Sequence, residues 1–166
     1  MPKASDDLKA GFAGESQANR RYLAFAKKAE EEGHPRIAHL FRAVAQAESV
    51  HGNNHLRAMD GINSTSENLE TAIAGEHYEV VTMYPDFIKD ADEEGDSRAK
   101  TSFNYAWQVE KVHEALYREA LENLDKEGPD DEEYFVCPVC GYTCKGKPPE
   151  KCPVCGTVGR RFDRVD

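Results

Sequence analysis

Apolar residues recur at intervals of three and four along four long segments of the chain, and this spacing predicts four amphipathic helices. Breaker residues end them, as in Gly33-His34-Pro35. Ser64 and Glu67 have the spacing of a capping box, and Pro85 predicts a kink inside the third helix. The predicted helices run from Leu8 to about Gly33, from Ile37 to Gly61, from Leu69 through Phe87, and from beyond Asp96 to about Gly128.

The apolar stripes of these helices contain acidic and imidazole side chains, which an ordinary core excludes. The phrase Glu48-x-x-His51 in the second helix returns as Glu110-x-x-His113 in the fourth. Residues three apart lie on one face of a helix, so each phrase directs a carboxylate and an imidazole to one point. The first and third helices add one inner acid each, Glu15 and Glu76, and Glu79 follows one turn later.

The second half of the helical region repeats the first, which indicates the internal duplication of a helix pair. Ala13-Gly14-Glu15 recurs as Ala74-Gly75-Glu76 at an offset of 61, and Tyr22 recurs as Tyr84 at an offset of 62. Glu79 has no counterpart in the first half. It is therefore an additional candidate ligand.

Four buried carboxylates without partners would destabilise a helical core, whereas two metal cations would compensate them. One glutamate from each of two helices, with a Glu-x-x-His phrase from each of the others, is the ligand set of ferritin-like di-iron and di-manganese bundles. Such donors suit iron and manganese, and zinc remains open. The alternative of exposed charges on misphased helices is disfavoured by the duplication. The predicted ligands are Glu15, Glu48, His51, Glu76, Glu79, Glu110 and His113.

The composition changes after Asp130, where two Cys-Pro-Val-Cys-Gly units follow an acidic run. So small a module needs a metal to hold its fold. The fifth cysteine, Cys144, is interpreted as a spare thiol rather than a ligand. We predict a ferritin-like domain over residues 1–130 and a small four-cysteine metal domain over residues 131–166. The cage for iron or zinc would be formed by Cys137, Cys140, Cys152 and Cys155.

The charge balance limits the possible partners. Thirty-one acidic residues against 21 basic ones give a net charge of −10, which argues against nucleic acid or an anionic membrane. No apolar run approaches the roughly 18 residues of a membrane span, and the first residues contain no apolar signal segment. We therefore expect a cytoplasmic protein, in which Cys-x-x-Cys units favour metal binding over disulfides.

With both candidate sites placed, the sequence resembles the rubrerythrin family over nearly its whole length. The resemblance rests on these motifs together with Gly14-Glu15-Ser16, Gly75-Glu76-x-x-Glu79 and Met83-Tyr84-Pro85. It implies a non-haem di-iron peroxidase that reduces hydrogen peroxide to water and protects against oxidative stress. It also implies that electrons pass through the iron of the four-cysteine site, from rubredoxin or an NAD(P)H-dependent reductase.

Four residues are candidates for catalytic roles. The resemblance implies that one iron is held by Glu79 in the oxidised state and by His51 in the reduced state. Tyr22 lies seven residues after Glu15 and Tyr84 five after Glu79, within reach of a ligand carboxylate. Both tyrosines are equally interpretable as core aromatics.

The link between the second and third helices is short for a single-chain bundle. In a ferritin-like bundle these helices run parallel, so the link must return about 27 Å and step sideways about 10 Å. Seven residue steps span at most about 25 Å, so we predict a domain-swapped homodimer. The fourth helix extends about 22 Å beyond His113. This predicts that a cysteine site lies far from its own chain's helix-four ligands and serves a centre shared with, or belonging to, another subunit.

Two other functions remain open from the residues alone. The same bundle could serve a ferroxidase or an iron-storage protein, although storage gives no role to the tail. The chain could also be a non-catalytic metal-binding protein whose tail is a structural zinc ribbon. A red ferric four-sulfur site that bleaches with reductant and recovers with peroxide would favour the peroxidase over both.

Overall fold

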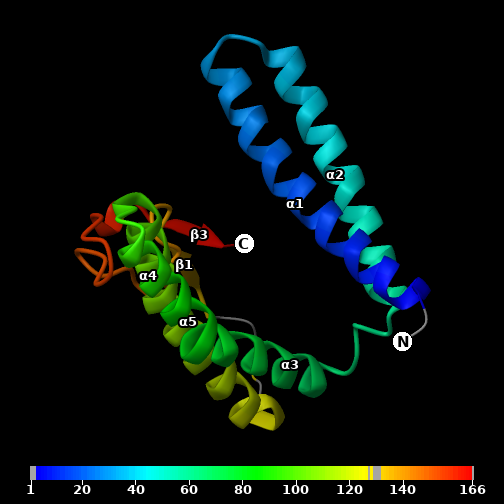
Figure 1. Cartoon of the computed structure of the whole chain (residues 1–166). Coiled ribbons are helices and arrows are strands. Elements are labelled where there is room, and N and C mark those ends of the chain that lie inside the picture. Colours follow the sequence, from blue (N-terminus) through cyan, green and yellow to red (C-terminus); the bar gives the residue numbers. More distant parts are fainter. Residues whose placement is uncertain (1–2, 127, 129–131, 166) are drawn as a thin grey trace. The chain divides into compact units, whose positions relative to one another are not determined.

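Two helix pairs and a small β-sheet make up the chain in the computed structural model, which describes residues 3–126, 128 and 132–165 (Figure 1). The chain divides into two compact units, Met1–Asn63 and Ser64–Asp166. The first unit holds one helix pair. The second holds the other pair together with the sheet.

Helices α1 (Lys3–Glu31) and α2 (Pro35–Ala58) form a hairpin, as the periodicity predicts (Figure 1). Gly33 turns the chain with a φ of 78°, which glycine adopts without strain. Pro35 lies in the first turn of α2, where its missing N–H leaves no bond unmade. The buried contact face consists of small side chains, so the helices can approach closely: Ala26, Ala29, Ala38 and Ala45.

Each helix pair also carries large apolar side chains that remain exposed. In the first unit Leu40 is 59% exposed and Phe25 is 47% exposed. In the second unit Tyr78 is 56% exposed and Val81 is 54% exposed. The contact within each helix pair therefore leaves large apolar side chains unburied.

The second helix pair begins at the predicted capping box, which the structure confirms. The Ser64 hydroxyl accepts a hydrogen bond from the Glu67 amide, and the Glu67 carboxylate accepts one from the Ser64 amide. Helix α3 (Thr65–Tyr78) follows. Helix α5 (Ser97–Asn123) is capped by the carboxylate of Asp96 and ends in a 3₁₀ turn, η2 (Leu124–Lys126).

A π-helix, η1 (Glu79–Met83), joins α3 to α4 (Tyr84–Glu93). A π-turn accommodates one residue more than an α-turn. The repeat has one extra residue in the same stretch, because the offset between the halves is 61 at Glu76 and 62 at Tyr84. The extra residue is therefore accommodated as the π-helix. The predicted kink at Pro85 stays a prediction; the α-helical pattern is interrupted in the turn before Pro85, which sits in the first turn of α4.

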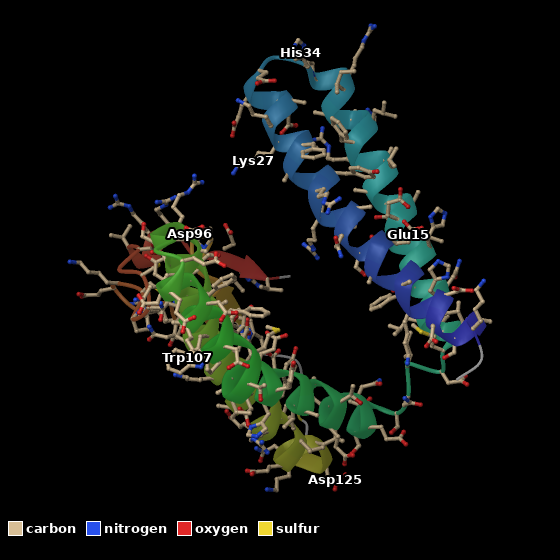
Figure 2. All side chains as sticks on the ribbon, in the orientation of Figure 1. Glu15, Lys27, His34, Asp96, Trp107 and Asp125 are labelled. Atoms are coloured by element: carbon tan, nitrogen blue, oxygen red, sulfur yellow. The ribbon has the colours of Figure 1, made fainter. Side chains whose placement is uncertain are left out.

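Trp107 on α5 supports this π-helix (Figure 2). The Tyr84 amide donates to the Glu79 carbonyl, five residues back. The next bond in this pattern would come from Pro85, which has no N–H. Instead, the indole Nε1 of Trp107 donates to the Val80 carbonyl at 2.8 Å.

The C-terminal module is an antiparallel sheet with strand order β2-β1-β3. Its strands are β1 (Tyr134–Val136), β2 (Thr143–Lys145) and β3 (Asp163–Val165), and a 3₁₀ turn, η3 (Gly159–Arg161), precedes β3. The buried centre consists of Cys137, Cys152 and Phe162. Cys144 lies in β2 and packs against this centre. The core of the module is thus built around cysteines rather than large apolar residues.

The observed elements confirm the predicted class, a mostly helical chain with a small C-terminal module. The predicted domain boundary at 130/131 lies outside the described residues and stays a prediction. Within the described part of the chain, no helix combines the length and apolar character needed to cross a membrane.

Candidate metal centres

The first helix pair holds one half of the predicted carboxylate site. One ligand atom from each of Glu15, Glu48 and His51 lies within 4.8 Å of the other two. His51 Nδ1 lies 2.9 Å from a Glu48 carboxylate oxygen and 3.9 Å from one of Glu15. Glu15, labelled in Figure 2, comes from α1 and the other two from α2. This hairpin therefore presents three donors at one point.

The second helix pair repeats the arrangement with Glu76, Glu110 and His113, again within 4.8 Å. His113 Nδ1 lies 2.6 Å from a Glu110 carboxylate oxygen. The glutamates of the two Glu-x-x-His motifs are equally buried, since the side chain of Glu48 is 15% exposed and that of Glu110 is 16% exposed. The duplication in sequence is thus a duplication in geometry.

The two histidines differ in their surroundings. The His51 side chain is 54% exposed, whereas that of His113 is 27% exposed. His113 also hydrogen-bonds through Nε2 to the Thr143 hydroxyl of the cysteine module, at 3.0 Å. With both ring nitrogens engaged, the His113 ring is fixed in orientation.

Crowding of acids in the second half-site changes their ionisation. Burial, followed by the nearby Glu110 carboxylate, raises the pKa of Glu76 to about 7. The same two causes raise the pKa of Glu79. Hydrogen bonding to Glu110 raises the pKa of His113 against the opposing effect of burial. Carboxylates held this close favour a cation among them, so the donor set fits a metal.

Glu79, Tyr22 and Tyr84 are not among the three-residue groups whose donor atoms lie within 4.8 Å of one another. Glu79 begins the π-helix and interacts electrostatically with Glu110 and His113. Burial and then the Glu79 carboxylate raise the pKa of Tyr84, which places its phenol near the acids. Tyr22 lies near the rings of Phe25 and Phe41, and Tyr84 near those of Phe87 and Phe103, and the roles of both tyrosines stay predictions.

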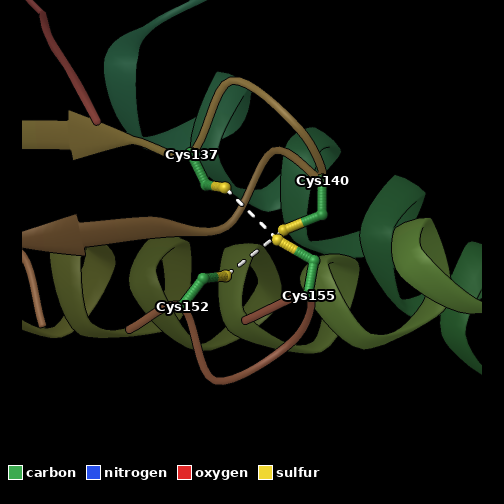
Figure 3. Close-up of side chains that lie close together, drawn as sticks. All are labelled: Cys137, Cys140, Cys152 and Cys155. Atoms are coloured by element: carbon green, nitrogen blue, oxygen red, sulfur yellow. Dashed lines mark hydrogen bonds between the residues drawn. The ribbon is translucent and has the colours of Figure 1, made fainter. Parts of the chain in front are cut away.

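The four predicted cage cysteines converge on one point (Figure 3). Their sulfur atoms lie within 4.8 Å of one another, with 3.6 Å between Cys137 and Cys155 and 3.4 Å between Cys140 and Cys152. Burial opposes ionisation of the Cys155 thiol, but hydrogen bonds, led by that of Thr157, outweigh it and lower its pKa to about 6. Four convergent sulfurs fit a tetrahedral iron or zinc.

The cysteine module lies against the middle of its own α5, which contradicts the predicted separation of this module from the helix-four ligands. Thr143 hydrogen-bonds to His113, and Lys145 binds the Glu119 carboxylate at 2.9 Å. Gly141, the residue after Cys140, packs near Val109 on the same helix. Helix length alone implied a distance of about 22 Å, but Thr143 in β2 contacts His113 in the middle of α5.

Sequence patterns missed three residues that support the centres. Asn19 on α1 donates to the Ala45 carbonyl and to the Ser49 hydroxyl, both at 2.8 Å, and so braces the helix beside Glu48. Thr143 and Trp107 act through the contacts described above. Asn19 falls on the polar part of the α1 stripe, which was a usable signal. Thr143 gave none.

Two matched Glu–His half-sites on helices, followed by a four-cysteine module, define a class of protein. It is that of non-haem carboxylate metalloproteins with an attached rubredoxin-like site.

Comparisons with known proteins identify the family within this class. The family model described as Rubrerythrin matches residues 6–121, and that described as Rubrerythrin, rubredoxin-like domain matches residues 135–163. Nigerythrin of Nitratidesulfovibrio vulgaris is 41% identical over 164 residues, covering 90% of this chain and 80% of nigerythrin. Rubrerythrin-2 of Clostridium acetobutylicum is 33% identical over 174 residues, covering 95% and 94%. The chain belongs to the rubrerythrin family.

A solved structure agrees. Nigerythrin in a fully reduced, all-ferrous state is 38% identical and matches with a TM-score of 0.60 over 97% of this chain and 86% of that one. These findings confirm the predicted fold class, a ferritin-like helical protein with a rubredoxin-like module. They also confirm the cofactor prediction, a di-iron carboxylate site from the Glu and His clusters and a four-cysteine metal site.

Proposed function

We propose that the protein is a peroxidase that reduces hydrogen peroxide to water and thereby protects the cell against oxidative stress. Each turnover consumes one H₂O₂, two protons and two electrons and releases two H₂O. The observation that carries the proposal is the 3.0 Å hydrogen bond between His113 Nε2 and the Thr143 hydroxyl, which joins a candidate iron ligand to the cysteine module. An iron-storage protein or a structural zinc ribbon gives no role to this contact.

In this proposal the individual donors have defined assignments. The di-iron centre would be held by Glu15, Glu48, His51, Glu76, Glu79, Glu110 and His113, and a single iron by Cys137, Cys140, Cys152 and Cys155. When bound, iron at these sites supplies one-electron oxidation and reduction.

The protein residues around the centre have complementary roles. His113 is the fixed ligand, because the Thr143 hydroxyl orients its ring through Nε2 and leaves Nδ1, which lies beside Glu110, for the metal. Among the described residues His51 has no partner equivalent to the Thr143 hydroxyl on His113, so it is the exchangeable ligand, and Glu79 at the π-helix is the carboxylate that replaces it. Tyr84, whose pKa is raised by burial and by Glu79, keeps its proton and can donate a hydrogen bond to a neighbouring carboxylate.

We also propose that two chains build each bundle by exchanging helix pairs. Seven residue steps separate Ala58 from Thr65. They span at most about 25 Å, which is less than the return path in a bundle of one chain. The exposed apolar residues on each pair supply surface for such an exchange. Each centre would then combine α1 and α2 of one chain with α3 and α5 of the other.

The electron source belongs to the same proposal. Electrons would come from a rubredoxin-type protein or an NAD(P)H-dependent reductase, enter at the cysteine site and leave at the centre that contains His113. The reaction would take place in the cytoplasm.

Visible absorption tests this function directly. Ferric iron bound by four cysteines is red, so the oxidised protein should bleach on anaerobic reduction and regain its colour when hydrogen peroxide is added. Anomalous scattering at the iron and zinc edges would identify the metals in the same preparation. Zinc in the cysteine site of protein produced with ample iron would refute the proposed relay.

A further inference from the structure

The basic residues of the chain are distributed unevenly. Residues 132–166 contain six Lys and Arg against five Asp and Glu, whereas residues 1–131 contain 15 against 26. The helical part is therefore strongly acidic, and the cysteine module is slightly basic. A negatively charged protein would be repelled by the acidic helices but not by the cysteine module.

An open groove of about 460 Å³ lies on this module, between two short segments. We call it the basic groove. Its walls are Lys147–Glu150 and Val158–Arg160. The Gly159 amide donates to the Glu150 carbonyl at 2.9 Å, and Lys151 pairs with Val158 in a β-bridge. A Cβ on Gly159 would lie 2.0 Å from the Pro149 carbonyl oxygen, so the backbone fixes the shape of the groove.

Four exposed cations lie in, or directly after, the two segments that form the basic groove. Among the described residues, none of them lies within 4.0 Å of a carboxylate oxygen, whereas Lys145 in the same module pairs with Glu119 and Glu132. Glu150 is the acidic residue in the lining. The four cations are Lys147, Lys151, Arg160 and Arg161. Charges left free at one place are available to an anionic partner.

The basic groove adjoins the metal-binding sulfurs. Lys151 and Val158 pair across the loop that carries Cys152 and Cys155, so the groove forms the base of that loop. Cys155 is partly exposed on the same loop. A molecule seated in the groove would therefore lie next to the site at which electrons enter in the proposed function.

We propose that the basic groove is the docking surface for an acidic electron-donor protein. Its half-buried Pro148, Pro149 and Val158 supply apolar contact, and the surrounding cations supply attraction and orientation. The surface suits a protein rather than a small anion because it is open and its cations border a proline-lined wall. This inference rests on the proposed function, since it names the partner of the same relay.

Charge reversal on the iron-loaded full-length protein tests the docking surface. The variant Lys147→Glu/Arg160→Glu is mixed in a stopped-flow instrument with a pre-reduced rubredoxin-type protein of net negative charge, and bleaching of the cysteine site is followed. We expect the second-order rate constant to fall about tenfold or more at low ionic strength. The deficit should shrink at about 0.5 M salt, where exposed charges are screened.

The matched control is Lys27→Glu/Arg36→Glu, which makes the same change in net charge on the first helix pair, where both residues are exposed. Lys27 is labelled in Figure 2. We expect this control to stay within about twofold of the wild-type rate constant, because its charges lie outside the docking surface. Equal losses in the two variants would show that overall charge, not the groove, governs the reaction, and would overturn the inference.

Reduction with dithionite separates this inference from the proposed function. If the groove is the docking surface, the Lys147→Glu/Arg160→Glu variant bleaches with dithionite and recovers colour with peroxide as the wild type does. A slow reaction with dithionite would mean that the substitutions damage the cysteine site, and would overturn the docking assignment. Failure of the dithionite-reduced wild type to recover colour with peroxide would instead refute the proposed peroxidase.

Discussion

At the scale of single residues, the two halves of the repeat share their donors but differ in what covers them. His51 and His113 occupy equivalent positions, and each lies beside the glutamate three residues earlier. The cysteine module contacts His113 through Thr143, while the His51 side chain stays 54% exposed. In the proposed function, His113 is accordingly the fixed ligand and His51 the exchangeable one.

Replacing Thr143 with Val tests the fixed role. The change removes the hydroxyl that contacts His113 Nε2, and loss of such an outer hydrogen bond should slow peroxide-driven recovery of the cysteine-site colour about tenfold. Thr143→Ser keeps the hydroxyl and should retain the wild-type rate in the same stopped-flow measurement. If both variants recover at one rate, the hydrogen bond has no part in the relay.

Glu67 gives a prediction for stability against pH. Hydrogen bonds from the Ser64 side chain and amide lower the pKa of Glu67 in the folded state. A lowered folded-state pKa contributes stability that is present above the unfolded value, near 4.5, and is lost as the pH falls through the folded value. In urea titrations, Glu67→Gln should lower the unfolding midpoint at pH 7. This difference from the wild type should narrow below pH 4.5.

At the scale of elements, the extra residue of the π-helix could be predicted from the sequence, but its conformation could not. The change in offset from 61 to 62 revealed one extra residue between Glu76 and Tyr84. Periodicity could not say whether it would form a kink, a loop or a π-turn, and proline made a kink at Pro85 the expected outcome. The conformation of the extra residue depends on a tertiary contact, the hydrogen bond from Trp107 to the Val80 carbonyl.

Deleting Val81 should convert the π-helix to α-helix and make the second half match the first. The helices should keep their packing, because Glu76 and Tyr84 would then be seven residues apart, as Glu15 and Tyr22 are. Circular dichroism should be unchanged, while peroxidase turnover falls about tenfold as Glu79 leaves its position. The control is deletion of Ala72, which rotates Leu69 by about 100° and should destabilise the fold. Full activity without Val81 would exclude a role for the π-helix.

At the scale of the whole molecule, the ligands and the helical core could be predicted because both follow the helical repeat. The position of the cysteine module could not, because it depends on the path of the chain after α5 and on contacts such as Lys145 with Glu119. The two compact units each hold one Glu–His half-site. In the proposed function, a complete centre combines one helix pair of each kind.

Complementation between inactive chains tests exchange of helix pairs. One chain carries Glu48→Ala/His51→Ala and the other Glu110→Ala/His113→Ala, and the two are unfolded and refolded together. Exchange gives each mixed dimer one intact centre, so random pairing should restore about a quarter of the wild-type activity and di-iron content. Two chains with the same lesion serve as the control and should restore nothing. A mixture as inactive as its components would mean that each bundle is built from one chain.

The most direct test of the central claim, that the cysteine site and the Glu–His centre act together on peroxide, is a single anaerobic reoxidation. Fully reduced wild-type protein and Glu110→Ala, each with iron in the cysteine site, receive one equivalent of hydrogen peroxide while absorption of the cysteine site is followed. We expect the wild type to regain its red colour and the variant to stay bleached. Recovery of the variant at the wild-type rate would contradict the claim, because the cysteine site would then react with peroxide without the centre.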